Sequence, residues 1–143
     1  MLDDWQGKQR FLWNVAHAQR LQVSERCHCT KRTQPTAFDQ INEVTELRAL
    51  YPWLADVPRD VQNQLLVDLD KSWQRYKGGT AGRPDFKRKG RDRAPIIEPN
   101  PKSFRLEGNG RKRHVQFPKL GLLEIVYHRA HEGVMKTCSI TQD

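Results

Sequence analysis

The hydrophobic pattern of this 143-residue chain changes near residue 80. Before that point apolar residues recur every three or four positions, as on one face of an α-helix, and after it they alternate with polar residues, as in β-strands. The strongest helical pattern follows Pro58, where Val61, Leu65, Leu69 and Trp73 are spaced by four. Helices followed by strands favour an α+β fold in which the two kinds of element form separate layers.

Two further helical patterns precede this one. We expect the first helix at about residues 5–23 and the second at about residues 38–50, with Thr36 as the N-cap of the second. Gly78 and Gly79 follow the third pattern and are typical of a helix end. The apolar stripe expected on the second helix consists of Phe38, Ile41, Val44 and Leu47.

The residues after 101 indicate short strands separated by turns. Gly108, Asn109 and Gly110 are typical of a hairpin, and further reversals are expected at 118–121 and 131–133. The strand segments are KSFRLE, RKRHVQFPKLG, LLEIVYH and VMKTCSIT. We therefore expect a three-helix lobe followed by a small antiparallel β-sheet or a partial β-barrel.

This pattern divides the chain into three parts. The helical lobe spans residues 1–79, a basic connecting segment with several prolines spans 80–101, and the strands span 102–143. The segment APIIEPNP within the connection is expected to be extended and to lead into the strands.

The net charge of +8 is concentrated in the second half of the chain. Residues 1–70 contain 8 Lys and Arg against 10 Asp and Glu, whereas residues 71–143 contain 17 against 7. Such asymmetry favours a nucleic acid or an anionic surface as the partner. No apolar run approaches 18 residues and the start, MLDDWQGKQR, is unlike a signal peptide, so we expect a cytoplasmic protein with no membrane partner.

The densest positive charge lies in the segment GRPDFKRKGRDR, which begins at Gly82. From composition alone, a solvated arm and a binding surface are equally supported. An aromatic ring inside the run, with Trp73 and Tyr76 just before it, favours binding, because rings can stack on bases while cations hold phosphates. The candidate contacts in this segment are Arg83, Phe86, Lys87, Arg88, Lys89 and Arg91.

The start of the third helix offers a second set of polar residues. Arg59, Gln62 and Asn63 have donors and acceptors that can match base edges, and the alternative interpretation is an ordinary exposed helix surface.

The sequence contains no pattern of residues that indicates catalysis or a cofactor. It has no nucleophile with a neighbouring base, no phosphate-binding glycine loop and no cluster of carboxylates. The Cys27-His28-Cys29 stretch lacks the second ligand pair that a structural zinc site requires, so we expect no metal site.

Several blocks, in one order, resemble the N-terminal half of the TnpB proteins of bacterial insertion sequences, a helix-turn-helix segment of OrfB-type transposases. The blocks are FDQINEVTELRALYPWLADVPRDVQNQLLVDLDKSWQRY, GRPDFKRKG, SFRLEGNG, VQFPKLGLLEIVYHR and EGVMKTCSIT.

The resemblance implies a fold and partners. TnpB is an RNA-guided DNA nuclease related to type V CRISPR effectors, with a helical recognition lobe, a wedge β-barrel and a RuvC nuclease domain. Residues 1–79 would correspond to the recognition helices and residues 80–143 to the wedge. The implied partners are DNA and a structured guide RNA, and the implied contacts are the start of the third helix and the PDFKRK block. The implied location is the bacterial cytoplasm.

The chain stops at Asp143, where the family continues into RuvC. We therefore expect a nucleic-acid-binding segment that is not itself an enzyme. The alternatives are a nuclease whose RuvC region is supplied by another polypeptide, a TnpB-derived repressor that binds DNA, and an interaction module that meets an acidic protein.

Overall fold

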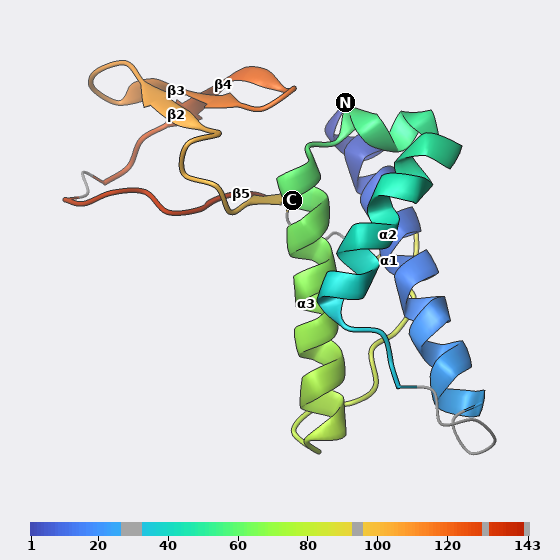
Figure 1. Cartoon of the computed structure of the whole chain (residues 1–143). Helices are drawn as coiled ribbons and strands as arrows, with labels where there is room; N and C mark the ends of the chain where they lie inside the picture. The colour runs from blue at the N-terminus through green and yellow to red at the C-terminus, as the bar shows by residue number, and fades with distance from the viewer. Residues whose placement is uncertain (27–32, 93–95, 130–131, 142–143) are drawn as a thin grey trace.

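The computed structural model describes residues 1–26, 33–92, 96–129 and 132–141. Within these ranges the helices are α1 (Leu2–Arg26), α2 (Ala37–Leu50) and α3 (Arg59–Lys77), with a 3-10 helix, η1 (Pro52–Asp56), between α2 and α3. The helices lie together and the strands lie beside them (Figure 1). The expected α+β fold is confirmed. The strands are β1 (Ile96–Glu98), β2 (Arg105–Glu107), β3 (Lys112–Phe117), β4 (Gly121–Val126) and β5 (Cys138–Ile140).

Local sequence signals account for the ends of α2 and α3. Thr36 is the N-cap of α2: its hydroxyl accepts from the backbone N–H of Asp39 (3.3 Å), and the Asp39 carboxylate accepts from the backbone N–H of Thr36 (2.8 Å). This reciprocal pair is a capping box. After α3, Gly79 has a φ of 71°, which permits the chain to turn away from the helix axis. Helix α1 is longer than the predicted 5–23.

The three helices share one apolar core. Val44 is fully buried, but Phe38, which was predicted on the same stripe, is 70% exposed. The prediction was wrong for Phe38 because α2 turns Gln40 and Val44 toward its neighbours, and Phe38 lies about 200° around the helix from Gln40. The core consists of Leu12, Trp13, Ala16, Val44, Leu65, Leu66, Leu69 and Trp73.

A buried polar network fixes the helices relative to one another. Arg20 is 1% exposed and donates to Gln40 on α2 (2.9 Å) and to Asp70 on α3 (2.8 Å). Gln40 also donates to the backbone carbonyl of Ala16 on α1 (2.9 Å). A buried charge requires such partners, so this network allows few alternative ways of packing the three helices.

The strands form two separate antiparallel sheets rather than a closed barrel. The three-stranded sheet has the order β2-β3-β4, with Leu106 opposite Val115 and Val115 opposite Leu123. The two-stranded sheet pairs β1 with β5. Strand β1 corrects the sequence interpretation, which placed residues 96–98 in the connecting segment. Its partner is some 40 residues away in the chain, so no local pattern announces the pairing.

A second apolar cluster joins the sheets to the helices. Trp5 at the start of α1 and Val61 on α3 pack with Ile96 on β1 and Phe117 on β3, and the rings of Trp5 and Phe117 are 6.3 Å apart. Phe117 is the one fully buried residue of β2, β3 and β4. The sheet is therefore attached at one end, and the rest of it projects away from the helices (Figure 1).

Candidate nucleic-acid interface

Residues 85–87 of the basic segment are held against α1 by three hydrogen bonds. The indole N–H of Trp13 donates to the backbone carbonyl of Asp85 (3.1 Å). The Asn14 side chain donates to the carbonyl of Lys87 (3.0 Å) and accepts from its backbone N–H (2.8 Å), because an amide has both a donor and an acceptor. The Lys87 ammonium also lies 4.4 Å from the centre of the Trp13 ring. This part of the segment is packed on the helical lobe rather than free in solvent.

The segment then makes a tight turn over residues 88–92. The carbonyl of Arg88 accepts from the backbone N–H of Asp92 (3.1 Å), and the Asp92 carboxylate accepts from the backbone N–H of Arg88 (2.7 Å). Gly90 has a φ of 80°, which this turn needs and which other residues adopt only with strain. The turn therefore holds the basic side chains around it on a defined backbone.

The ring of Phe86 rests on a buried histidine. His17 meets Phe86 edge to face at 4.8 Å, and its Nδ1 accepts from the indole N–H of Trp73 (3.2 Å). His17 and Trp73 are both 1% exposed, whereas Phe86 is 46% exposed. One side of the Phe86 ring thus packs against His17, and the rest of the ring is open to solvent. Tyr76, 41% exposed, contacts Trp73 in a T-shaped arrangement nearby.

The environment of His17 favours its neutral form. Burial lowers the pKa of this imidazole, and the positive charge of Arg83 lowers it further. A neutral ring can accept the Trp73 hydrogen bond, while a protonated ring has no free lone pair to do so. At neutral pH the support beneath Phe86 is therefore intact.

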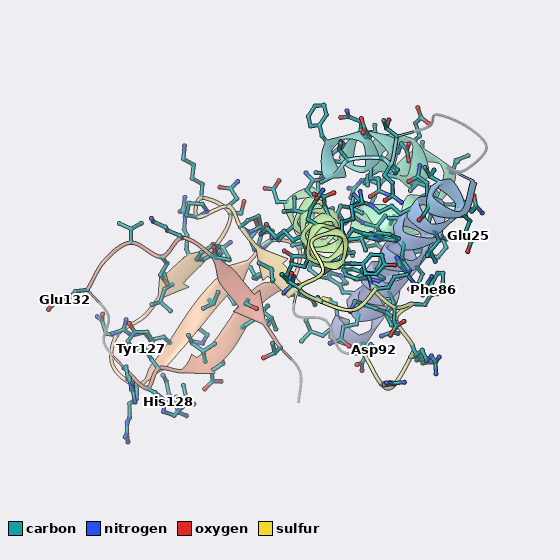
Figure 2. The ribbon with its side chains drawn as sticks, turned by 90° about the horizontal axis from the view of Figure 1, so that it is seen from below. Glu25, Phe86, Asp92, Tyr127, His128 and Glu132 are labelled. Carbon is teal, nitrogen blue, oxygen red and sulfur yellow. The ribbon has the colours of Figure 1, made fainter. Side chains whose placement is uncertain are left out.

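Several exposed cations lie on the same segment as this ring. Figure 2 shows Phe86 and Asp92 on one side of the helical lobe, on the segment that runs beside α1. An exposed ring among exposed cations can bind nucleic acid, since the ring stacks on bases and the cations neutralise phosphates. The exposed cations of the segment are Arg83, Arg88, Lys89 and Arg91.

The residues predicted at the start of α3 form no comparable surface. Gln62 is fully buried and donates to the carbonyl of Leu54 (2.9 Å), so its interpretation as a nucleic-acid contact is corrected. The exposed Arg59 donates to the Thr45 hydroxyl on α2 (2.7 Å), and the Oδ1 atom of Asn63 is buried. The reason is that Gln62 packs inward against η1, while Arg59, although exposed, is bonded to α2.

The basic residues of the strand region lie elsewhere, whereas Arg75 on α3 borders the basic segment. Tyr127 and His128 mark the end of the strand region, which Figure 2 shows at the opposite end of the molecule from Phe86. There the Arg113 guanidinium lies 3.9 Å from the Tyr127 ring centre, and Lys112 is 3.9 Å from Glu124. The positive charge predicted from the sequence is consequently divided between two surfaces.

Sequence reasoning missed the residues that support the interface. Asn14 and His17 belong to α1, more than 65 residues before the segment that they contact. The one available signal was the presence of polar residues within an otherwise helical, partly apolar stretch, and this signal does not identify their partners.

The described ranges contain no group of three or more His, Cys, Asp or Glu residues arranged to hold a metal ion. The Cys27-His28-Cys29 stretch lies outside those ranges. Cys138 is a half-buried free thiol, and burial together with the neighbouring Glu98 raises its pKa. Across the described ranges, no helix has both the length and the apolarity needed to cross a membrane.

No protein-family model matches the chain, and no curated protein matches it closely enough to be counted as a relative. The resemblance to TnpB stays a prediction.

Proposed function

We propose that this protein binds nucleic acid through the basic segment 82–92 and has no nuclease site of its own. The observation that carries the proposal is the docking of the segment on α1 by Trp13 and Asn14. Docking fixes the backbone that presents the exposed ring of Phe86, so binding a ligand costs less chain entropy than it would on a free arm. A solvated arm would have to be ordered by the ligand itself.

In this geometry the cations and the ring of Phe86 contribute differently to binding. The four exposed cations supply affinity for the sugar-phosphate backbone without regard to sequence. The exposed ring adds contact with bases wherever these are unpaired.

The role that fits best is that of the DNA- and RNA-binding part of a TnpB-like transposon protein. The order of the resembling blocks along the chain supports this role, as does the succession of a helical lobe and antiparallel strands. In that role the partners would be target DNA and a structured guide RNA. A TnpB-derived repressor would use the same surface on DNA alone.

Salt dependence tests the electrostatic part of the proposal. If contact is confined to the four exposed cations, affinity for a single strand should fall about 50-fold between 50 and 200 mM salt. A fall of 10³-fold or more would mean that cations outside the segment also take part. Fluorescence anisotropy with a labelled single-stranded oligonucleotide measures the affinity at 50 and at 200 mM salt. No binding at 50 mM salt would overturn the proposal.

A matched pair of variants tests the role of docking. Asn14→Ala removes two of the three hydrogen bonds that hold residues 85–87 on α1 but leaves every charge in place. We expect it to weaken binding about as much as Lys89→Gln, which removes one exposed cation. Lys102→Gln, which removes an exposed cation outside the segment, is the control and should bind like the wild type. Wild-type affinity in Asn14→Ala would show that a mobile segment binds equally well.

A further inference from the structure

A hollow of about 300 Å³ lies where the basic segment meets α1 and the last turns of α3. Trp13 of α1 contributes to it, and Ser72 and Arg75 of α3 form another wall. This volume is at the lower limit of pockets that hold small ligands, so it suits one planar group rather than several. The segment itself contributes Ala81, Gly82, Pro84, Asp85, Phe86, Lys87 and Asp92.

Phe86 also lines a second, smaller hollow. The second has a volume of about 160 Å³ and is lined by Asp85, Phe86 and Asp92 together with Arg88 and Arg91. The two hollows thus share one half-exposed ring and two carboxylates, and each has arginine on its wall. Aromatic surface beside guanidinium groups is the combination that holds a base and its neighbouring phosphates.

Asp85 offers a hydrogen-bond acceptor at both hollows. A carboxylate repels phosphates, so a purely electrostatic binding segment gains nothing from it. Asp92 is explained by the turn, because its carboxylate accepts from Arg88. The carboxylate of Asp85 has no such bond among the residues that the structure describes, and it borders both hollows. A carboxylate placed there can accept from the amino group of a base.

We propose that the larger hollow is a binding site for one unpaired nucleobase, which stacks on Phe86 and directs an amino group to Asp85. Arg75 in the same hollow and Arg88 in the second would then hold the flanking phosphates. This site rests on the proposed function, and it narrows the ligand to single-stranded or bulged nucleic acid. A base inside a duplex cannot use it, because both of its faces are covered by its neighbours.

A fluorescent base gives a direct test. The probe is a thymine single strand that carries one 2-aminopurine, a base with an amino group whose fluorescence is quenched by stacking. The wild type should quench the probe, prefer it to the all-thymine strand, and prefer single strands to a duplex of equal length. Phe86→Ala should weaken single-strand binding about tenfold and leave duplex binding within twofold.

Two further variants separate ring, carboxylate and charge. Asp85→Ala, which removes the acceptor, should abolish the preference for 2-aminopurine over thymine and strengthen duplex binding slightly, because it also removes a charge that repels phosphates. Lys89→Gln, which changes neither hollow, should weaken single-strand and duplex binding by the same factor. Circular dichroism and the thermal midpoint establish that each variant is folded.

The outcomes distinguish this site from the proposed function. If the wild type binds both oligonucleotides with the expected salt dependence but leaves 2-aminopurine fluorescent, and Phe86→Ala binds like the wild type, the base site is wrong and nucleic-acid binding stands. If the wild type binds neither oligonucleotide at 50 mM salt, the proposed function is wrong and the base site with it.

Discussion

The helical lobe and the strand region differ in how each is held together. Leu66, Leu69 and Trp73 on α3 are at most 1% exposed, and the buried Arg20 ties the three helices to one another. The three-stranded sheet has a single fully buried residue, Phe117. Both Leu122 and Val126 on β4 are 60% exposed.

This difference shows which part of the molecule can act as a scaffold. The basic segment is docked on α1, within the well-packed lobe, so its geometry does not depend on the sheet. The sheet depends on the lobe instead, through the contact of Phe117 with Trp5. Regions with few buried apolar contacts open locally at lower free energy than the core. We therefore expect the sheet to open first and the candidate interface to remain.

The largest effect should come from a cavity in the lobe. Leu66 is fully buried, and Leu66→Ala should lower the free energy of unfolding by about 3 kcal/mol. The half-buried Leu123 on β4 is the matched position in the sheet, and Leu123→Ala should cost about 1 kcal/mol. Urea denaturation followed by circular dichroism measures both. Equal losses would mean that the two regions are packed equally well.

The attachment of the sheet is tested by Phe117→Ala. Truncating a buried Phe costs about 3–5 kcal/mol in a well-packed core, but here the loss is limited by the low local stability of the sheet, and we expect about 2 kcal/mol. Hydrogen exchange should accelerate in β2, β3 and β4 and stay unchanged in α2 and the middle of α3. Faster exchange throughout the molecule would show that lobe and sheet unfold together.

The sequence predicts what depends on neighbours in the chain. Thr36 and Asp39 are three residues apart, and the α3 stripe repeats every four, so the cap, the helix and the overall α+β class follow from local patterns. Strand β1 and the site of docking could not be predicted in this way. Ile96 pairs with Ile140, and Asn14 binds Lys87, across 44 and 73 residues respectively.

Burial explains the remaining errors. Gln62 has the side chain of a base-reading residue and lies on the expected helix, yet it is fully buried under η1 and α2. Its polarity is used for an internal hydrogen bond, and a sequence does not show which polar residues are used in this way.

Smaller effects on stability and proteolysis should distinguish the local capping contact of Thr36 from the long-range docking contact of Asn14. Thr36→Ala removes the capping box and should lower the free energy of unfolding by about 1 kcal/mol. Asn14→Ala should change global stability less than this, because the segment that it releases is mostly exposed. Limited trypsin digestion should instead cleave Asn14→Ala faster after Lys87 and Arg88, with Thr36→Ala cleaved there like the wild type. Equal cleavage of both variants would contradict the docking geometry.

The smallest effect should be an opposite response to pH of the contacts around His17 and of the pairing of β1 with β5. The pKa of His17 is lowered by burial from its ordinary value of 6.5, so the unfolded state binds the proton more tightly. The stability that His17 contributes is complete above pH 6.5 and is lost as the pH falls through the folded pKa. Acid should therefore loosen the contact of His17 with Phe86 and Trp73.

Glu98 on β1 behaves in the reverse sense. It is fully buried, faces Cys138 and lies near Asp60, and burial raises its pKa from the ordinary value of 4.5. Its contribution is complete below pH 4.5 and is lost as the pH rises through the folded pKa, so base should loosen the pairing of β1 with β5. Hydrogen exchange at pH 5.5 and 7.5, corrected for the intrinsic rate, should show opposite changes in the two regions. His17→Gln should remove the pH-dependent change around His17, and Glu98→Gln should remove the change in β1 and β5. Changes of exchange in the same direction in both regions would contradict this assignment of the buried groups.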